Sequence, residues 1–228
     1  MEQQMEIQIP FGPAIMLGRV PDDIFNLLKK YSEQVKGDGF NDYRDKLAGN
    51  IAEEYDLMSS MIQNNEFQPV SKYLLDLADG YIDFLSNTKR IIFNTEVDGL
   101  SHYDSGSRPM LLQSLWVNFQ KKYEFNPPHN HTGVFSFVTY LKVPYKMEDE
   151  AKLPHQKGNS PNAGKITFQC GDYDFAPVSK EYVPEVQKII FFPAELKHWV
   201  YPFYTSDDER VSVSGNIIVD PNIQLKRK

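Results

Sequence analysis

The chain has 228 residues, of which 41% are hydrophobic, so it can bury one sizeable core. Its formal net charge of −7 disfavours non-specific binding to nucleic acid or to an anionic membrane surface. We find no run of about 18 apolar residues and expect no membrane span. We also expect no signal peptide at the polar start Met1–Glu6, and the single cysteine, Cys170, fits a reducing compartment, so a cytoplasmic protein is predicted.

The N-terminal third predicts helices that brace a sheet. Residues 7–19 read as a short strand that two prolines interrupt, which suits an edge or a bulge. Residues 21–35 begin with Pro-Asp-Asp and continue with apolar residues at helical spacing. The apolar residues of 47–58 and of 71–85 predict two further helices.

The composition changes after residue 90, where β-branched and aromatic runs alternate with turn residues. The predicted strands are Pro109–Phe119, Val134–Val143, Lys165–Gln169, Gln187–Phe192, His198–Tyr204 and Arg210–Val219. Short strands at this spacing indicate an antiparallel sandwich or barrel. The polar insertion at 145–164 is predicted to be a mobile lid or binding loop. We therefore expect one domain over 1–228, with a mostly helical brace at 1–90 and a β core at 91–220.

His129 and His131 are the first candidate site residues. They stand at i and i+2 at the start of a predicted strand, so their side chains point to the same side of an extended chain. Pro127 and Pro128 stiffen the approach, and Gly133 allows an unusual backbone angle after it. Two converging imidazoles suit metal binding, although a solvated loop with two incidental histidines has the same pattern.

His198 follows a predicted turn and opens the next strand. In an antiparallel barrel this position can face the end at which His129 and His131 emerge, although an ordinary core or surface histidine is an equal alternative for His198 alone. Together the three residues offer three nitrogen ligands, which suit iron, zinc, copper or nickel.

Arg210 opens the last predicted strand and shares one strand face with Ser212 and Ser214. An arginine and two hydroxyls facing a core need a polar ligand, and the guanidinium group matches a carboxylate with two parallel hydrogen bonds. A solvent-exposed sheet face would explain the same pattern without a ligand.

The order H-x-H, then Phe-Pro-x-x-x-x-His, then Arg-x-Ser-x-x-x-Asn resembles the iron(II)/2-oxoglutarate-dependent oxygenases. It looks most like the 2OG-Fe(II) oxygenase group, frequent in phage and marine bacterial genomes, that has H-x-H where other members have H-x-Asp/Glu. The resemblance covers roughly Leu112–Val219 and implies a mainly β fold, the double-stranded β-helix (jelly-roll, cupin-like), with N-terminal bracing helices. It implies the cofactors Fe(II), 2-oxoglutarate and O₂.

The same resemblance implies roles for single residues. His129 and His198 match the two histidine ligands of the family. Arg210 matches the arginine that binds the distal carboxylate of 2-oxoglutarate, with Ser212 beside it. Asn118 and Tyr140 match polar positions that line the cosubstrate pocket.

The chain departs from the family's usual two-histidine, one-carboxylate ligand set, because His131 occupies the carboxylate position. Either the site holds three histidines or an acid from elsewhere completes it, with Glu195, Asp172 and Asp174 as the candidates. We favour His129, His131 and His198 as the metal ligands.

The predicted function is a 2-oxoglutarate-dependent dioxygenase that hydroxylates a small-molecule or peptidyl substrate and releases succinate and CO₂. The alternatives are a three-histidine zinc hydratase or hydrolase and a cupin-like binding module without turnover. The charge disfavours nucleic acid and membrane partners. The sequence leaves the substrate and the oligomeric state open.

Overall fold

The computed structural model describes residues 5–9, 12–88, 94–171 and 178–225. Its strands form two sheets. The seven-stranded sheet has the order β1 (Glu6–Gln8), β2 (Ile15–Arg19), β9 (Lys188–Pro193), β6 (Phe135–Lys142), β11 (Arg210–Val219), β4 (Met110–Gln120), β3 (Glu54–Asp56). The four-stranded sheet has the order β5 (Asn126–His129), β10 (Lys197–Val200), β7 (Ile166–Cys170), β8 (Val178–Tyr182).

The strands β4 to β11 pair from the outside inwards. Antiparallel pairs join β4 with β11, β5 with β10, β6 with β9 and β7 with β8. The chain therefore runs as one long hairpin that is rolled across both sheets, which is the topology of a jelly roll. The predicted double-stranded β-helix is confirmed.

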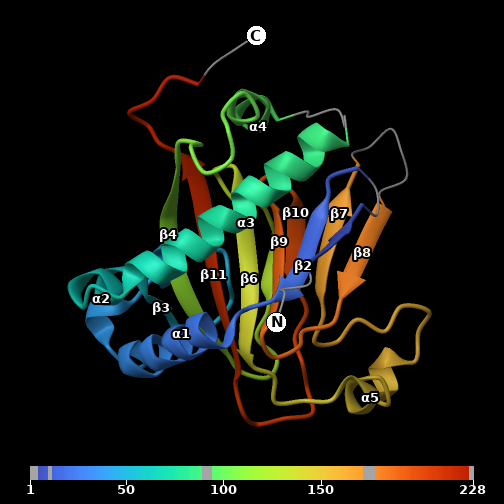
Figure 1. Cartoon of the computed structure of the whole chain (residues 1–228). Helices are drawn as coiled ribbons and strands as arrows, with labels where there is room; N and C mark the ends of the chain where they lie inside the picture. The colour runs from blue at the N-terminus through green and yellow to red at the C-terminus, as the bar shows by residue number, and fades with distance from the viewer. Residues whose placement is uncertain (1–4, 10–11, 89–93, 172–177, 226–228) are drawn as a thin grey trace.

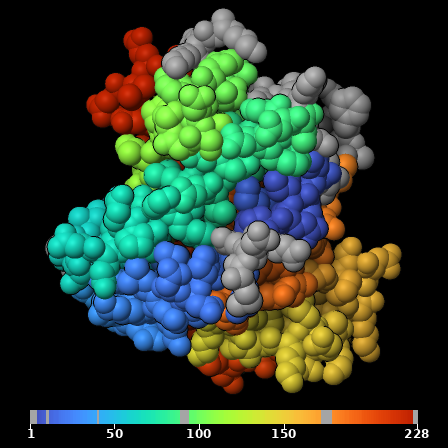
Figure 2. Space-filling model, viewed as in Figure 1, coloured from blue at the N-terminus to red at the C-terminus, as the bar shows by residue number. Residues whose placement is uncertain are grey.

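Helices cover the outer face of the large sheet (Figures 1 and 2). They are α1 (Asp22–Val35), α2 (Met58–Gln63), α3 (Phe67–Asn87) and α4 (Thr95–Leu100). The apolar side chains of α1 and α3, among them Leu28, Leu74 and Ile82, are buried in one cluster with Phe135 and Phe191 of the sheet. The predicted helices over 21–35 and 71–85 are present, and α3 extends beyond its predicted bounds at both ends.

The prediction of a helix over 47–58 is wrong. Residues Arg44–Lys46 form a short 3₁₀ turn, and β3 pairs with β4 in the register Glu54 to Asn118. Backbone pairing with the edge of the large sheet overrides the helical spacing of the apolar residues here. The N-terminal 90 residues thus supply β1, β2 and β3 to the sheet in addition to helices.

Strand β5 was not predicted because its sequence is Asn-Pro-Pro-His. Proline lacks the N–H donor that a central strand needs, so it is tolerated only at an edge or a bulge. β5 is the first strand of the small sheet and pairs only with β10, which gives the two prolines such an edge.

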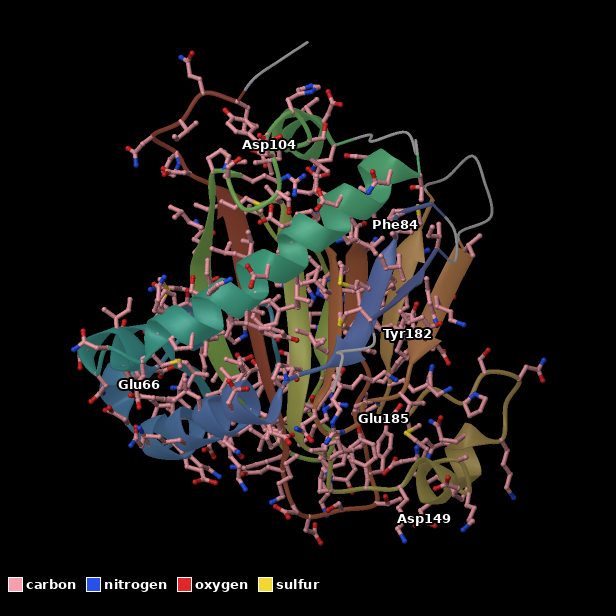
Figure 3. The ribbon with its side chains drawn as sticks, viewed as in Figure 1. Glu66, Phe84, Asp104, Asp149, Tyr182 and Glu185 are labelled. Carbon is pink, nitrogen blue, oxygen red and sulfur yellow. The ribbon has the colours of Figure 1, made fainter. Side chains whose placement is uncertain are left out.

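The insertion between β6 and β7 is packed where it meets the barrel. It holds α5 (Met147–Glu150) and the 3₁₀ turn Pro154–Gln156, and it lies at the lower end of the barrel in Figure 1. The buried carboxylate of Glu150 accepts hydrogen bonds from the backbone N–H groups of Tyr204 and Thr205 at 2.8–3.1 Å. Asp149, beside it in the chain, is exposed (Figure 3). In the described residues, no helix is both long and apolar enough to cross a membrane.

Candidate active site

Three histidines from two strand regions meet at one end of the small sheet. His129 ends β5, His131 follows it, and His198 of β10 is the direct cross-strand partner of His129. The ring centroids lie 4.3 Å apart for His129 and His198, and 5.0 Å apart for each of the other two pairs. One nitrogen from each ring lies within 4.8 Å of the others, a spacing at which one metal ion can contact all three.

Backbone carbonyls fix the orientation of two of these rings. The Nδ1 atom of His129 lies 2.7 Å from the carbonyl oxygen of Pro127, and that of His198 lies 2.8 Å from the carbonyl oxygen of Leu196. A carbonyl oxygen only accepts, so each Nδ1 carries the proton and each Nε2 keeps its lone pair. This is the tautomer that a metal-binding histidine needs.

Burial keeps the cluster uncharged. It lowers the pKa of His131 to about 4, with a smaller contribution from neighbouring His129. Burial also lowers the pKa of His198 well below its usual value, and His129 and His131 add to that effect. The pKa of His129 is lowered by burial, and the carbonyl of Pro127 partly opposes the change. Neutral imidazoles are the form that binds metal.

No carboxylate joins the histidines among the residues that the structure describes. Glu195 is exposed to solvent, and Asp172 and Asp174 lie outside the described residues. Nitrogen-only donor sets of this kind fit Fe(II), zinc, copper or nickel, so the residues present fit the iron that the sequence motif implies.

Arg210 is the first residue of β11 and is only 2% exposed. Its Nη1 donates to the hydroxyl of Tyr145 at 2.7 Å and to the carbonyl of Gly164 at 2.8 Å, and its Nη2 donates to the Oε1 of Gln120. The Nε–H and the second Nη2 donor have no acceptor among the described residues. The guanidinium group thus keeps two donors that a carboxylate can accept from.

One cavity joins the arginine to the histidines. It holds about 520 Å³ of empty space, part of it open to solvent. Its lining includes all three histidines and Arg210, together with the other predicted site residues Asn118, Tyr140 and Ser212. In the described chain no carboxylate pairs with Arg210, so a buried cation faces the cavity without a counter-charge.

Sequence reasoning missed the side chains that hold Arg210. Gln120 comes from β4 and Tyr145 from the insertion, and both are buried. Gln120 has a sequence signal: it shares the strand face of Asn118 two residues earlier. Tyr145 has none, because its ring packs on Phe203 and its contact with Arg210 depends on how the insertion folds back.

Residues 114–216 match the model of the family described as "Putative 2OG-Fe(II) oxygenase". That range begins just before Trp116, which packs near His131, and ends within β11. The matched segment therefore contains the three histidines, Arg210 and most of the cavity lining. No curated protein sequence matches the chain.

Solved structures with a similar course of the chain include oxygenases. A prolyl-4-hydroxylase from Pseudomonas putida is 15% identical over 96% of this chain and 94% of that one, with a TM-score of 0.47. A Trichoplax adhaerens prolyl hydroxylase, solved with a hypoxia inducible factor peptide fragment, is 12% identical over 95% and 84%, with a TM-score of 0.49. A Burkholderia pseudomallei oxidoreductase of the 2OG-Fe(II) oxygenase family is 16% identical over 61% and 57%, with a TM-score of 0.36. None of these likenesses indicates a substrate for this chain.

Proposed function

We propose that the chain is a dioxygenase of the 2OG-Fe(II) oxygenase family, whose model residues 114–216 match, and that its iron is held by His129, His131 and His198. The family's cofactors are Fe(II), 2-oxoglutarate and O₂. The proposed ligand atoms are the Nε2 atoms of His129 and His198, whose Nδ1 atoms point to backbone carbonyls, together with one ring nitrogen of His131. Three neutral ligands leave the metal's double positive charge uncompensated, which favours a dianionic cosubstrate.

The unpaired charge of Arg210 is the observation that carries this proposal. We infer that its Nε and Nη2 donors bind the distal carboxylate of 2-oxoglutarate. Ser212 and Tyr140 line the same cavity as Arg210 and the histidines and are in register on β11 and β6. Their hydroxyls, with the amide of Asn118, are the proposed further contacts of the cosubstrate.

The proposed reaction is the hydroxylation of a C–H bond. Bound iron and 2-oxoglutarate supply the oxidation, in which one atom of O₂ enters the substrate and the other enters succinate while CO₂ leaves. The chain's own residues supply orientation: Arg210 fixes one end of the cosubstrate and the histidines fix the other. The substrate is proposed to be a small molecule or a peptidyl side chain.

Arg210 also separates this proposal from a zinc hydratase or a binding module without turnover. A zinc-bound hydroxide has no use for an unpaired guanidinium group in the cavity. A dicarboxylate can form two parallel hydrogen bonds with that group. We further propose that 1–228 forms a single domain, since the N-terminal helices and the large sheet share one buried cluster. Limited proteolysis that released a stable fragment of 91–220 would contradict that part.

The test is the binding of 2-oxoglutarate to Arg210 variants, measured by calorimetry on Mn(II)-loaded protein without oxygen. Losing one partner of a buried charge pair costs about 2–5 kcal/mol, so Arg210→Ala should weaken binding roughly 30-fold or more while metal binding persists. Arg210→Lys keeps the charge but loses the bidentate geometry, so its affinity for 2-oxoglutarate should lie between those of the wild type and Arg210→Ala. The control is Lys142→Ala, which removes an exposed cation that pairs with Asp208.

Wild-type protein supplied with Fe(II), O₂ and 2-oxoglutarate should also release succinate slowly without a substrate. An unchanged affinity in Arg210→Ala would overturn the cosubstrate assignment. Iron that never binds would overturn the metal assignment.

A further inference from the structure

Four polar side chains form a row across the interior face of the large sheet. Cα pairing aligns Tyr140 of β6 with Ser212 of β11, Ser212 with Asn118 of β4, and Asn118 with Glu54 of β3. Directly paired residues in adjacent strands project their side chains to the same face. All four are at most 9% exposed, so the row continues the cavity wall from Tyr140 to a buried acid.

Glu54 ends this row without a cation partner among the described residues. It is 1% exposed, and its Oε2 atom is buried with no hydrogen bond. Arg44 is the cation whose charge reaches it, but Arg44 is exposed and pairs with Asp42. An ionised carboxylate held in this way is strongly disfavoured.

The groups around Glu54 are oxygen acceptors. The Oδ1 atoms of Asn118 and Asn126 are both buried without a donor, and both residues line the cavity. A side-chain carbon placed on Gly49 would lie 2.9 Å from the Oε1 of Glu54 and 2.6 Å from the Oδ1 of Asn126. The Oε1 of Glu54 and the Oδ1 of Asn126 therefore both lie near Gly49, and a proton on Glu54 would supply a donor for one of the unpaired amide oxygens.

We propose that Glu54 is a positioning residue that, as a neutral acid, donates its one proton to the Oδ1 of Asn118 and so holds that oxygen towards β3 and the NH₂ group towards the cavity. This inference rests on the proposed function, because the NH₂ group of Asn118 then meets the cosubstrate. The Nδ2 of Asn118 lies 3.5 Å from the hydroxyl of Ser212, the next member of the row, which agrees with this orientation.

Ionisation of Glu54 reverses the arrangement. A carboxylate only accepts hydrogen bonds, so it attracts the NH₂ group of Asn118 and leaves the amide oxygen facing the cavity. That oxygen repels an anionic ligand. Affinity for 2-oxoglutarate should therefore be high when Glu54 is neutral and fall when it ionises.

The surroundings of Glu54 shift its pKa into the pH range over which binding can be measured. Burial, with smaller contributions from the charges of Glu124 and Asp42, raises its pKa to about 7 against the opposing charge of Arg44. A single linked proton changes a binding constant by at most about tenfold per pH unit. The dissociation constant of the wild type should therefore approach that slope above pH 7.

The experiment compares wild type with Glu54→Gln, measuring 2-oxoglutarate binding to Mn(II)-loaded protein by calorimetry between pH 6 and pH 8.5. Glutamine keeps the shape and a permanent donor, so the ratio of the two dissociation constants should be near one at pH 6 and rise several-fold by pH 8.5. The ratio cancels the titration of other groups. Glu53→Gln, which removes the neighbouring charge paired with Lys121, is the matched control and should follow the wild type. A pH-independent ratio would overturn the proposal.

A second measurement on the wild type does not depend on that variant folding. The ¹³C resonance of the Glu54 side-chain carboxyl is followed with pH in Zn(II)-loaded protein, with and without 2-oxoglutarate. Because linkage is reciprocal, the cosubstrate should raise the pKa of Glu54. An unchanged or lowered pKa in the presence of bound 2-oxoglutarate would overturn the positioning role. Absence of 2-oxoglutarate binding at every pH and in every variant would instead overturn the proposed function.

Discussion

The hydroxyl of Tyr145 accepts a hydrogen bond from Arg210 at 2.7 Å and donates one to the carbonyl of Gly164, also at 2.7 Å. The two ends of the insertion are thus joined to each other and to the buried cation. A segment that the sequence presents as a polar loop therefore takes part in placing the guanidinium group.

Tyr145→Phe removes this hydroxyl and keeps the ring stacked on Phe203. A hydrogen bond to a charged group contributes about 1.5–3 kcal/mol, and the carbonyl of Gly164 remains as an acceptor for Arg210. We expect 2-oxoglutarate affinity to fall about tenfold with metal affinity unchanged, measured by calorimetry on Mn(II)-loaded protein. Equal affinity in both proteins would show that Arg210 is placed without this residue.

Gln120→Glu puts a carboxylate where the amide oxygen now accepts from Arg210. The new charge pairs with the guanidinium and competes with the cosubstrate, so 2-oxoglutarate binding should weaken while the metal-free protein becomes harder to unfold. Denaturant unfolding and calorimetry measure the two effects. Gln120→Met is the control, since it fills similar space without charge. A carboxylate that left 2-oxoglutarate affinity intact would contradict a role for the Arg210 charge.

His198→Ala should abolish iron retention through purification, because it removes one of three proposed ligands and the cross-strand partner of His129. His131→Asp should retain iron, since it restores a two-histidine, one-carboxylate set. Elemental analysis of the purified proteins measures both. Wild-type iron content in His198→Ala would exclude that residue as a ligand.

Glu54 also links stability to pH in the metal-free protein. Its pKa is raised from 4.5 to about 7 on folding, so between these values the folded state binds more protons than the unfolded state. The free energy of unfolding should therefore decrease as pH rises from 4.5 to 7, by on the order of 3 kcal/mol at most. Glu54→Gln removes that decrease. Denaturant titrations at pH 5 and pH 8 should show the variant relatively more stable at the higher pH.

Glu150→Ala tests whether the insertion is packed or mobile. The buried carboxylate of Glu150 binds the backbone of Tyr204 and Thr205, so its loss should speed hydrogen exchange in 145–164 and in 203–206 together. Glu148→Ala, an exposed neighbour, is the control. Exchange that is already fast throughout the insertion in the wild type would support the sequence-based prediction of a mobile lid.

Much of the barrel could be predicted because its strands carry the alternation of a half-buried sheet. Arg210, Ser212 and Ser214 occupy one face of β11, and all three line the cavity. The histidines were predictable for a similar reason: His129 and His131 share a side of the chain, and His198 opens the strand that pairs with β5.

The remainder depends on contacts that local pattern does not encode. Tyr55 has helical spacing with the other apolar residues of 47–58, yet its segment pairs with β4 and forms strand β3. Glu54 reads as a surface acid in the sequence and becomes buried through the same pairing. Asn126 belongs to β5, which the sequence does not predict as a strand because it contains two prolines. The position of Asn126 in the cavity wall is therefore known only from the structure.

The pairing of His129 with His198 has a consequence for folding. The chain between them contains β6, β7, β8 and β9, so a metal ion bound to both residues closes a long loop, as a covalent cross-link would. Closing a long loop in advance removes conformational entropy from the unfolded chain. β5 is short, proline-rich and paired on one side only, and so depends most on this closure. Removal of the metal by a chelator should accordingly separate β5 from β10 first and leave the helix-covered large sheet folded.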